Sequence, residues 1–317
     1  MSIQSDQILR HAYSLLISGD PVGAKTLLED ALADDLENAE ILFTVRCVNY
    51  WTDIITRLAH NEPTFEKGDK LIDHWKRFIK DLSNGTTPIF EQSLNVIRKG
   101  IFSLALENFQ IFLDDRKPLL RAEAYRKVGL CYKQLGEYES ALICLSESNS
   151  LIENTVITTE VASVLAEMAD CYALCGQDNN AKVLFREAFF INANKIDLVF
   201  LESELILRLI EIVQKKGFRE DVMKEWIPVY GVLYGVFNIK RQLKPQEVGK
   251  LKQTIYILEN ELKVPNSDPD LIIPKLINHY FWLIDHYVSS NDDRSKINET
   301  LLKIKVLDND IHSKYTM

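Results

Sequence analysis

The feature that most constrains this 317-residue chain is a pattern of small and aromatic residues that occurs twice in succession, over residues 122–145 and 162–193. In the first copy Tyr125, Gly129 and Tyr132 stand at positions i, i+4 and i+7, which share one face of a helix. Each copy predicts two short antiparallel helices joined by a tight turn. Two consecutive copies in register predict that such helix pairs stack on one another.

Four positions of the pattern have a clear physical role. They are Gly129, Gly136, Ala141 and Leu145 in the first copy, and Ala169, Gly176, Ala181 and Phe185 in the second. The first and third are small, so that the two helices can approach closely. The second is a glycine, which can adopt the positive φ that ends a helix. The fourth is large and fills the gap between pairs, because one pair cannot bury its apolar face alone.

The pattern resembles that of the tetratricopeptide repeat (TPR) family. The resemblance covers residues 5–228 and is specific for residues 122–195, while weaker copies begin at residues 5, 39, 86 and 203. It implies an all-α protein built as a right-handed α-solenoid of stacked antiparallel helix pairs. It also implies a non-catalytic protein that binds other proteins.

We expect two regions along the chain. Residues 1–228 should form the TPR-like repeats, and residues 229–317 should form additional helices that pack on the solenoid and cap it. Whether these additional helices act as a separate module stays open. Outside the repeats proper, the helices that we expect span about 39–60, 66–82, 226–239, 270–289 and 292–307.

The family resemblance also implies a groove, because TPR proteins usually bind ligands through fixed positions of each first helix. Carried onto this sequence, those positions are Glu123, Arg126, Leu130, Lys133, Gln134, Ser163, Ala166, Asp170, Ala173, Glu204, Leu207 and Glu211. Their charges are mixed, which does not favour a clamp for a terminal carboxylate. They suit an extended or helical segment that carries its own basic residues. The alternative is that they form an ordinary solvated surface.

Three functions are compatible with these features. The first is an adaptor that holds a peptide segment or helix of a partner protein in the groove. The second is a structural subunit of a larger assembly, which would use convex or terminal surfaces and self-associate. The third is a peptide-responsive regulator.

The charge of the chain bears on other partners. A net charge of −9 disfavours binding to nucleic acid or anionic membranes, because phosphate contacts dominate such affinity. A local exception is the basic group of Lys240, Arg241, Lys244, Lys250 and Lys252. This group is either a phosphate or lipid patch or a solvated helix end, where basic side chains are favoured.

The five cysteines indicate a reducing compartment, and together with the absence of a leader signature they favour a cytoplasmic protein. Cys131 and Cys171 should pack in the core. Cys171 and Cys175 are spaced so that they could share a metal, as could His279 and His286, but packing is the interpretation we favour.

No phosphate-binding loop or nucleophile motif occurs, so we expect neither enzyme activity nor a cofactor. No apolar run reaches about 18 residues, so we expect no membrane insertion.

Overall fold

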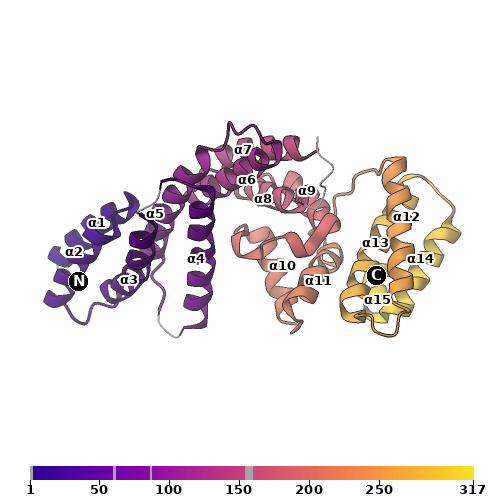
Figure 1. The fold of residues 1–317 in the computed structure, drawn as a ribbon. Coiled ribbons are helices and arrows are strands. Elements are labelled where there is room, and N and C mark those ends of the chain that lie inside the picture. The colour runs from indigo at the N-terminus through magenta and orange to yellow at the C-terminus, as the bar shows by residue number, and fades with distance from the viewer. Residues whose placement is uncertain (1–2, 60–61, 86–87, 154–159) are drawn as a thin grey trace. The chain divides into compact units, whose positions relative to one another are not determined.

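Every regular element of the described chain is a helix (Figure 1). The computed structural model describes residues 3–59, 62–85, 88–153 and 160–317. Within these residues the all-α class predicted from the sequence is confirmed. The chain divides into two compact units, an N-terminal unit of Met1–Asn154 and a C-terminal unit of Thr155–Met317.

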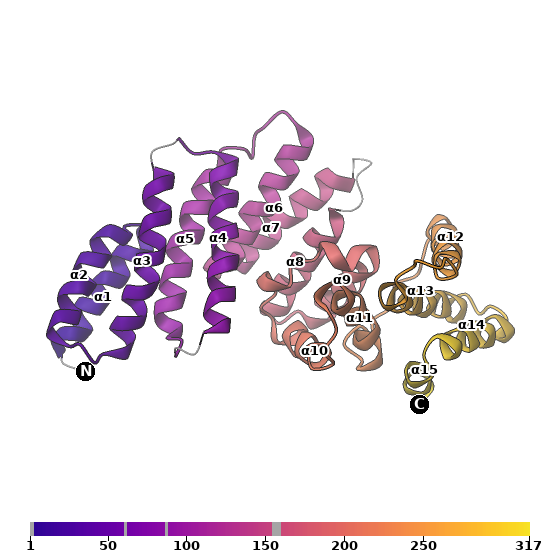
Figure 2. The same cartoon turned by 60° about the horizontal axis from the view of Figure 1, so that its bottom comes forward.

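The N-terminal unit is organised around one central helix, α5. The helices described in this unit are α1 (Ile3–Ile17), α2 (Pro21–Asp34), α3 (Ala39–Ala59), α4 (Phe65–Asn84), α5 (Glu91–Gln110), α6 (Pro118–Leu135) and α7 (Tyr138–Glu153). Consecutive helices pack as pairs at α1/α2 and α6/α7, while α5 contacts α1, α3, α4 and α6. Figures 1 and 2 both show α4 and α5 side by side.

The copy over residues 122–145 forms the pair α6/α7, as predicted. Helix α6 ends at Gly136, whose φ of +88° is the left-handed conformation that glycine adopts without strain. A Cβ added to Gly129 would lie 2.7 Å from Cγ of Leu145, so a larger residue would push the two helices apart. Ala141 and Leu145 are completely buried where the helices meet.

The helices expected over 39–60 and 66–82 correspond to α3 and α4. The weaker copy that begins at residue 86 does not form a helix pair, because α5 runs unbroken through the position at which the pattern predicts a turn. Gly100 lies inside α5, where an added Cβ would be 2.1 Å from the main-chain oxygen of Leu16 in α1. This glycine allows close packing of two helices and does not make a turn, which is why the pattern was misleading here.

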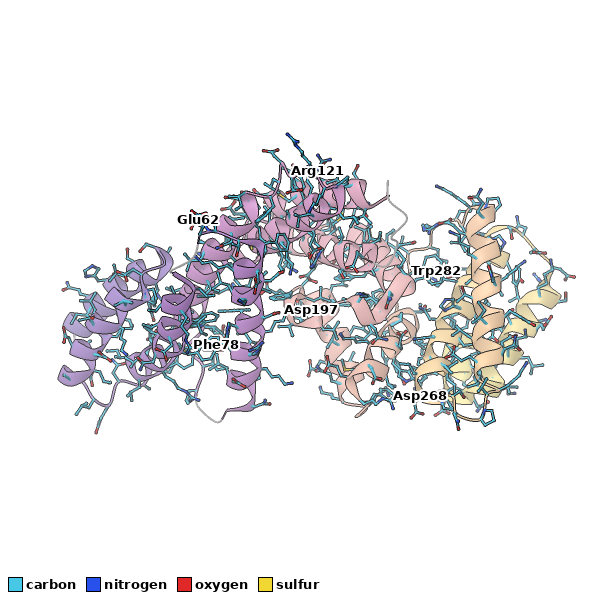
Figure 3. The ribbon with its side chains drawn as sticks, viewed as in Figure 1. Glu62, Phe78, Arg121, Asp197, Asp268 and Trp282 are labelled. Atoms are coloured by element: carbon cyan, nitrogen blue, oxygen red, sulfur yellow. The ribbon has the colours of Figure 1, made fainter. Side chains whose placement is uncertain are left out.

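Large aromatic side chains join α3 to α4. The rings of Trp51 and Trp75 stack with centroids 6.1 Å apart, and Phe78 packs edge-on against Trp51 at 5.6 Å. Phe102 of α5 closes the cluster against Trp75. Trp75 and Phe78, the latter labelled in Figure 3, are buried in the core. Such rings bury much area and prefer these tilted and offset arrangements.

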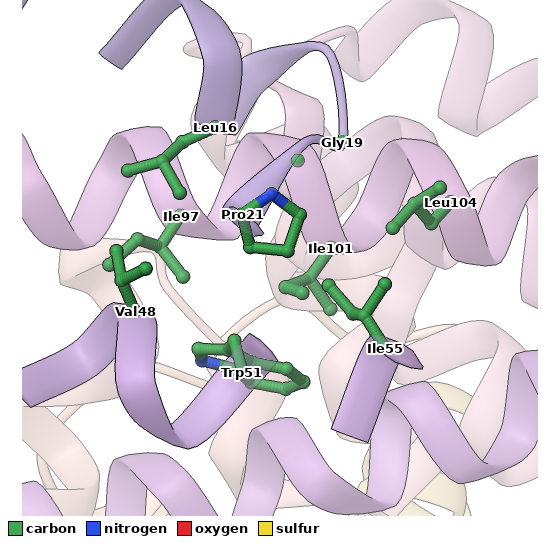
Figure 4. A pocket seen from close by; sticks show the side chains of 10 residues that line it. Leu16, Gly19, Pro21, Val48, Trp51, Ile55, Ile97, Ile101 and Leu104 are labelled. Atoms are coloured by element: carbon green, nitrogen blue, oxygen red, sulfur yellow. The ribbon is translucent and has the colours of Figure 1, made fainter. Parts of the chain in front are cut away.

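A small apolar cavity lies where α1, α3 and α5 meet (Figure 4). Leu16, Val48, Trp51 and Ile101 border it, and its volume is about 10 Å³. A space of this size holds at most one water molecule, and a water needs two to four polar partners, whereas Nε1 of Trp51 is the one polar side-chain atom among the bordering residues. The cavity therefore belongs to the packing of the core.

The C-terminal unit begins with two helix pairs. The helices described in this unit are α8 (Val161–Leu174), α9 (Asp178–Asn192), α10 (Glu204–Gln214), α11 (Glu220–Leu233), α12 (Pro245–Glu261), α13 (Pro269–Ser289), α14 (Arg294–Leu307) and α15 (Asn309–Thr316). Gly176 between α8 and α9 and Gly217 between α10 and α11 both have positive φ, near +75°. Ala181 and Phe185 are fully buried, so the second strong copy also has the predicted core.

The helix predicted over residues 226–239 begins and ends six residues earlier than expected, because α11 spans Glu220–Leu233. Helix α11 ends at Leu233, and the chain then turns back at Gly235, whose φ is +71°. Phe237 is fully buried against Gly231, where an added Cβ would be 2.4 Å from its ring. The burial of this phenylalanine is what ends the helix early.

The last four helices belong to the same compact unit as the second strong copy. Helix α13 contacts α11, α12 and α14, and α14 contacts α15. The predicted helices 270–289 and 292–307 correspond to α13 and α14, whereas α15 was not expected. Residue 228, where we expect the repeats to end, lies within α11, and α11 packs on α13. The division into residues 1–228 and 229–317 stays a prediction.

Candidate functional site

On α6 the predicted groove positions are mostly buried. Leu130, Lys133 and Gln134 are at most 2% exposed, so these three are corrected from contact residues to packing residues. The physical reason is that α6 packs between α5 and α7.

The remaining α6 positions, Glu123 and Arg126, are half-buried and bind each other through two hydrogen bonds of 2.9 and 2.6 Å. Lys127 beside them reaches Asp69 of α4 at 2.6 Å. Burial by itself would raise the pKa of Glu123, but Arg126 and Lys127 together hold it below its ordinary value. Glu123 is therefore an ionised member of a local charge network.

On α8 the structure gives Asp170 a role that the sequence analysis did not foresee. Its side chain is completely buried. The amide of Glu202 donates to Oδ2 at 2.9 Å, and the amide of Ser203 donates to Oδ1 at 2.8 Å. These are the amides just before α10, so Asp170 fixes the start of that helix. Its assignment to the groove is corrected.

The other predicted positions on α8 are also buried or hydrogen-bonded within the C-terminal unit. Ala166 is buried, and Ala173 is half-buried. The hydroxyl of Ser163 donates to the main-chain oxygen of Lys195 at 2.9 Å. None of these three presents an open polar group to a partner, and α8 acts as a support for the segment that leads to α10.

On α10 all three predicted positions are exposed together. Glu204, Leu207 and Glu211 stand at i, i+3 and i+7 and share one side of the helix. The opposite side is the apolar side that packs in the unit, with Ile206, Leu209, Ile210 and Val213. Leu207 is 44% exposed. We call the exposed group of Glu204, Leu207 and Glu211 the α10 face.

The α10 face carries two carboxylates. Glu204 is paired with Arg208, and Glu211 is paired with Lys215 at 2.7 Å. The hydrogen bond from Lys215 lowers the pKa of Glu211, so this carboxylate is ionised at neutral pH. Both pairs are solvent-exposed and contribute little to folding, so a partner can replace them at small cost.

Two residues of the basic group after α11, Lys240 and Arg241, are bound to acidic residues of the same unit. Lys240 binds Asp285 at 2.5 Å. Arg241 binds both Glu187 and Glu247 through several hydrogen bonds. These contacts match the interpretation as a helix end better than that of a phosphate or lipid patch.

A buried charge cluster escaped the sequence analysis. Arg186 of α9 and Asp285 of α13 form an ion pair that is at least 93% buried on both sides, and Lys240 joins it. The guanidinium of Arg186 also lies over the ring of Trp282, at 4.8 Å, and Trp282 is labelled in Figure 3. The partners are far apart along the chain, so no local spacing could have revealed them.

The cysteines and histidines considered as ligands are placed as follows. Cys131 and Cys171 are fully buried, which confirms their place in the core. Cys175 is half-buried. His279 is held by a 2.7 Å contact between Nδ1 and the main-chain oxygen of Lys275, and burial lowers its pKa. Among the described residues no three His, Cys, Asp or Glu side chains gather as a metal site requires.

No helix in the described part of the chain has the length and apolar character needed to span a bilayer.

Comparison with known proteins does not place the chain in a family. No protein-family model matches the sequence, and no curated protein matches it. The resemblance to TPR proteins therefore stays a prediction, and it rests on the sequence pattern.

Proposed function

We propose that this protein is a non-catalytic adaptor whose α10 face binds a segment of a partner protein that carries basic residues. The observation that supports it is the exposure of Glu204, Leu207 and Glu211 on one side of a single helix. At neighbouring predicted positions on α6 and α8 the side chains are buried or bonded within the fold.

The α10 face suits a short helical or extended segment. The two carboxylates are seven residues apart, which is about 10 Å along a helix. An apolar side chain of the partner would cover Leu207, and basic side chains on either side of it would meet Glu204 and Glu211. Apolar contact would supply most of the affinity, while the charges would set the association rate and its dependence on salt.

The proposal extends to the architecture and location of the protein. In the C-terminal unit the pairs α8/α9 and α10/α11 follow each other along the chain, and in the N-terminal unit α1/α2 and α6/α7 are pairs of the same kind. We interpret these pairs as degenerate TPR-like repeats of a right-handed α-solenoid. The five cysteines, an odd number, favour the cytoplasm as the place where it acts.

The test combines crosslinking with charge reversal. A photo-crosslinking residue at position 207 should capture one partner protein from the source cells. The double variant Glu204→Lys, Glu211→Lys should lose that product. A matched control is Glu66→Lys, because Glu66 and Lys70 form an exposed pair with the same 2.7 Å separation as Glu211 and Lys215. A product that survives the double reversal would contradict the proposal.

One observation favours the second function, a structural subunit of a larger assembly. Leu302 and Val306, one turn apart on α14, are 60% and 80% exposed. Isolated exposed apolar residues are common, but an apolar pair on one helix side is typical of association surfaces. Sedimentation at increasing concentration tests it: self-association that the variant Leu302→Ser, Val306→Ser abolishes would favour the structural function over the adaptor.

A further inference from the structure

The C-terminal unit contains a polar cavity of about 220 Å³ that is separate from the α10 face. It is bordered by α9, α11, the segment after α11, α13 and α15. The side chains that matter for its chemistry are Arg186, Phe237, Lys240, Asp285, Lys314 and Tyr315. Its volume is suitable for a small molecule and too small for a folded partner.

Arg186 is the buried donor of this cavity. Its side chain is 3% exposed. One terminal nitrogen donates to Asp285, and the other donates to the main-chain oxygen of Ile239 at 3.4 Å. Its Nε is buried and has no hydrogen-bond partner among the described residues. A buried donor without an acceptor is unfavourable, so an acceptor from a bound molecule would be stabilised here.

Positive charge exceeds negative charge around the cavity. Arg186, Lys240 and Lys314 border it, whereas Asp285 is the one carboxylate among the bordering residues. Asp285 already binds both Arg186 and Lys240. Lys314 is exposed at the rim and forms no ion pair within the part of the chain that the structure describes. An anion in the cavity would therefore meet a net attraction.

The other residues that border the cavity indicate what kind of anion it could bind. Val232 and Leu233, which are half-buried, give the cavity an apolar side. Burial raises the pKa of Tyr315, so its phenol stays protonated and can donate a hydrogen bond. The carboxylate of Asp285 within the cluster would repel a second negative charge on the ligand. A molecule with one negative charge and a short apolar body is compatible with all of the residues that border the cavity.

We propose that this cavity binds a small organic carboxylate with a short apolar body. The carboxylate would accept from Nε of Arg186 and from Tyr315, with Lys314 at the entrance as the second cation. The apolar body would lie against Val232 and Leu233. This site does not depend on the α10 face, so either proposal can fail without the other.

The experiment measures thermal stabilisation and calorimetric binding with the full chain. Hexanoate is the first probe, and N-acetyl-leucine, which has the carboxylate of a peptide C-terminus, is the second. The neutral hexanamide is the matched control ligand. Stabilisation by either acid and none by the amide is the expected result, and the tighter of the two acids tells a free metabolite from a peptide end.

Variants separate the site from general charge effects. Lys314→Gln should weaken binding about tenfold, the change expected for loss of one charge-assisted contact. Lys305→Gln, which removes an exposed lysine of α14, should leave binding unchanged. Arg186→Gln should abolish binding if it folds, and Tyr315→Phe provides a milder test inside the cavity. Stabilisation by inorganic phosphate with no response to either acid, or equal binding by Lys314→Gln and wild type, would overturn the proposal.

Discussion

Helices α6 and α10 hold equivalent positions in the sequence pattern, yet they present opposite surfaces. On α6 the predicted contact residues Leu130, Lys133 and Gln134 are buried. On α10 Glu211, which corresponds to Leu130, is exposed, and so are Glu204 and Leu207, which correspond to the half-buried Glu123 and Arg126. The difference arises because α6 packs between two long helices, whereas α10 packs mainly on α11. A shared pattern therefore indicates how a helix pair forms and does not indicate which of its sides stays open.

The largest effect that would test this comparison is expected at Asp170. The change Asp170→Ala removes the acceptor of two buried main-chain amides and should cost about 3 kcal/mol of unfolding free energy. The exposed carboxylate of Glu211 is the control, and Glu211→Ala should leave the denaturation midpoint nearly unchanged. Denaturant titration measures both, and equal midpoints would show that Asp170 does not anchor α10.

The second prediction compares a buried with an exposed carboxylate on α11. Glu225 is 6% exposed, and burial raises its pKa from 4.5 to about 7, although Lys275 and Asn194 partly offset this. Below pH 4.5 both folded and unfolded states hold the proton. As pH rises from 4.5 to about 7 the unfolded state loses it first, so this residue makes stability fall over that window.

The change Glu225→Gln should remove this dependence. At pH 8 the variant should be more stable than wild type by about 2 kcal/mol, and at pH 5 the difference should nearly vanish. Glu220→Gln on the same helix is the control, because Glu220 is 82% exposed. A gain that is the same at both pH values would mean that ionisation of Glu225 is not its cause.

The third prediction concerns the packing of α6 against α7. Ala141 is completely buried, and Ala141→Leu should overpack the crossing and cost about 2 kcal/mol. Ile143 on the same helix is 72% exposed, so Ile143→Leu should be nearly neutral. Thermal denaturation of the two variants distinguishes them. If both behave like wild type, the assignment of the crossing residue is wrong.

The smallest effect on stability is expected on the α10 face. The double reversal Glu204→Lys, Glu211→Lys should leave the unfolding free energy nearly unchanged, since exposed pairs contribute little. Its effect should be on partner binding, with a weaker dependence on salt than wild type shows. A large loss of stability would show that Glu204 and Glu211 take part in packing, as the buried residues of α6 do. The comparison between exposed α10 and buried α6 would then be wrong.

Much of the helix content could be predicted from the sequence. The pairs α6/α7 and α8/α9 follow from Gly136, Gly176, Ala141 and Ala181, because close approach and a left-handed turn each need a particular kind of residue. Local spacing failed at Gly100, where a glycine that permits contact with α1 looks the same in the sequence as one that makes a turn.

The candidate site was predicted less completely than the fold. Position in the pattern led to twelve residues, but burial depends on neighbours that are distant along the chain. Asp170 shows this: its partners, the amides of Glu202 and Ser203, lie more than 30 residues later. Of the predicted groove positions, those on the α10 face are the ones that are exposed together.

The sequence by itself determined that this protein is helical and where its clearest helix pairs begin and end. These properties depend on contacts within about 35 residues, and small residues, glycines and apolar spacing encode them directly. Only the tertiary structure decided that Lys133 is buried, that Phe237 ends α11, and that Arg186 meets Asp285 beside a cavity. Such contacts join residues whose spacing along the chain follows no local rule, so they appear only when the helices are packed.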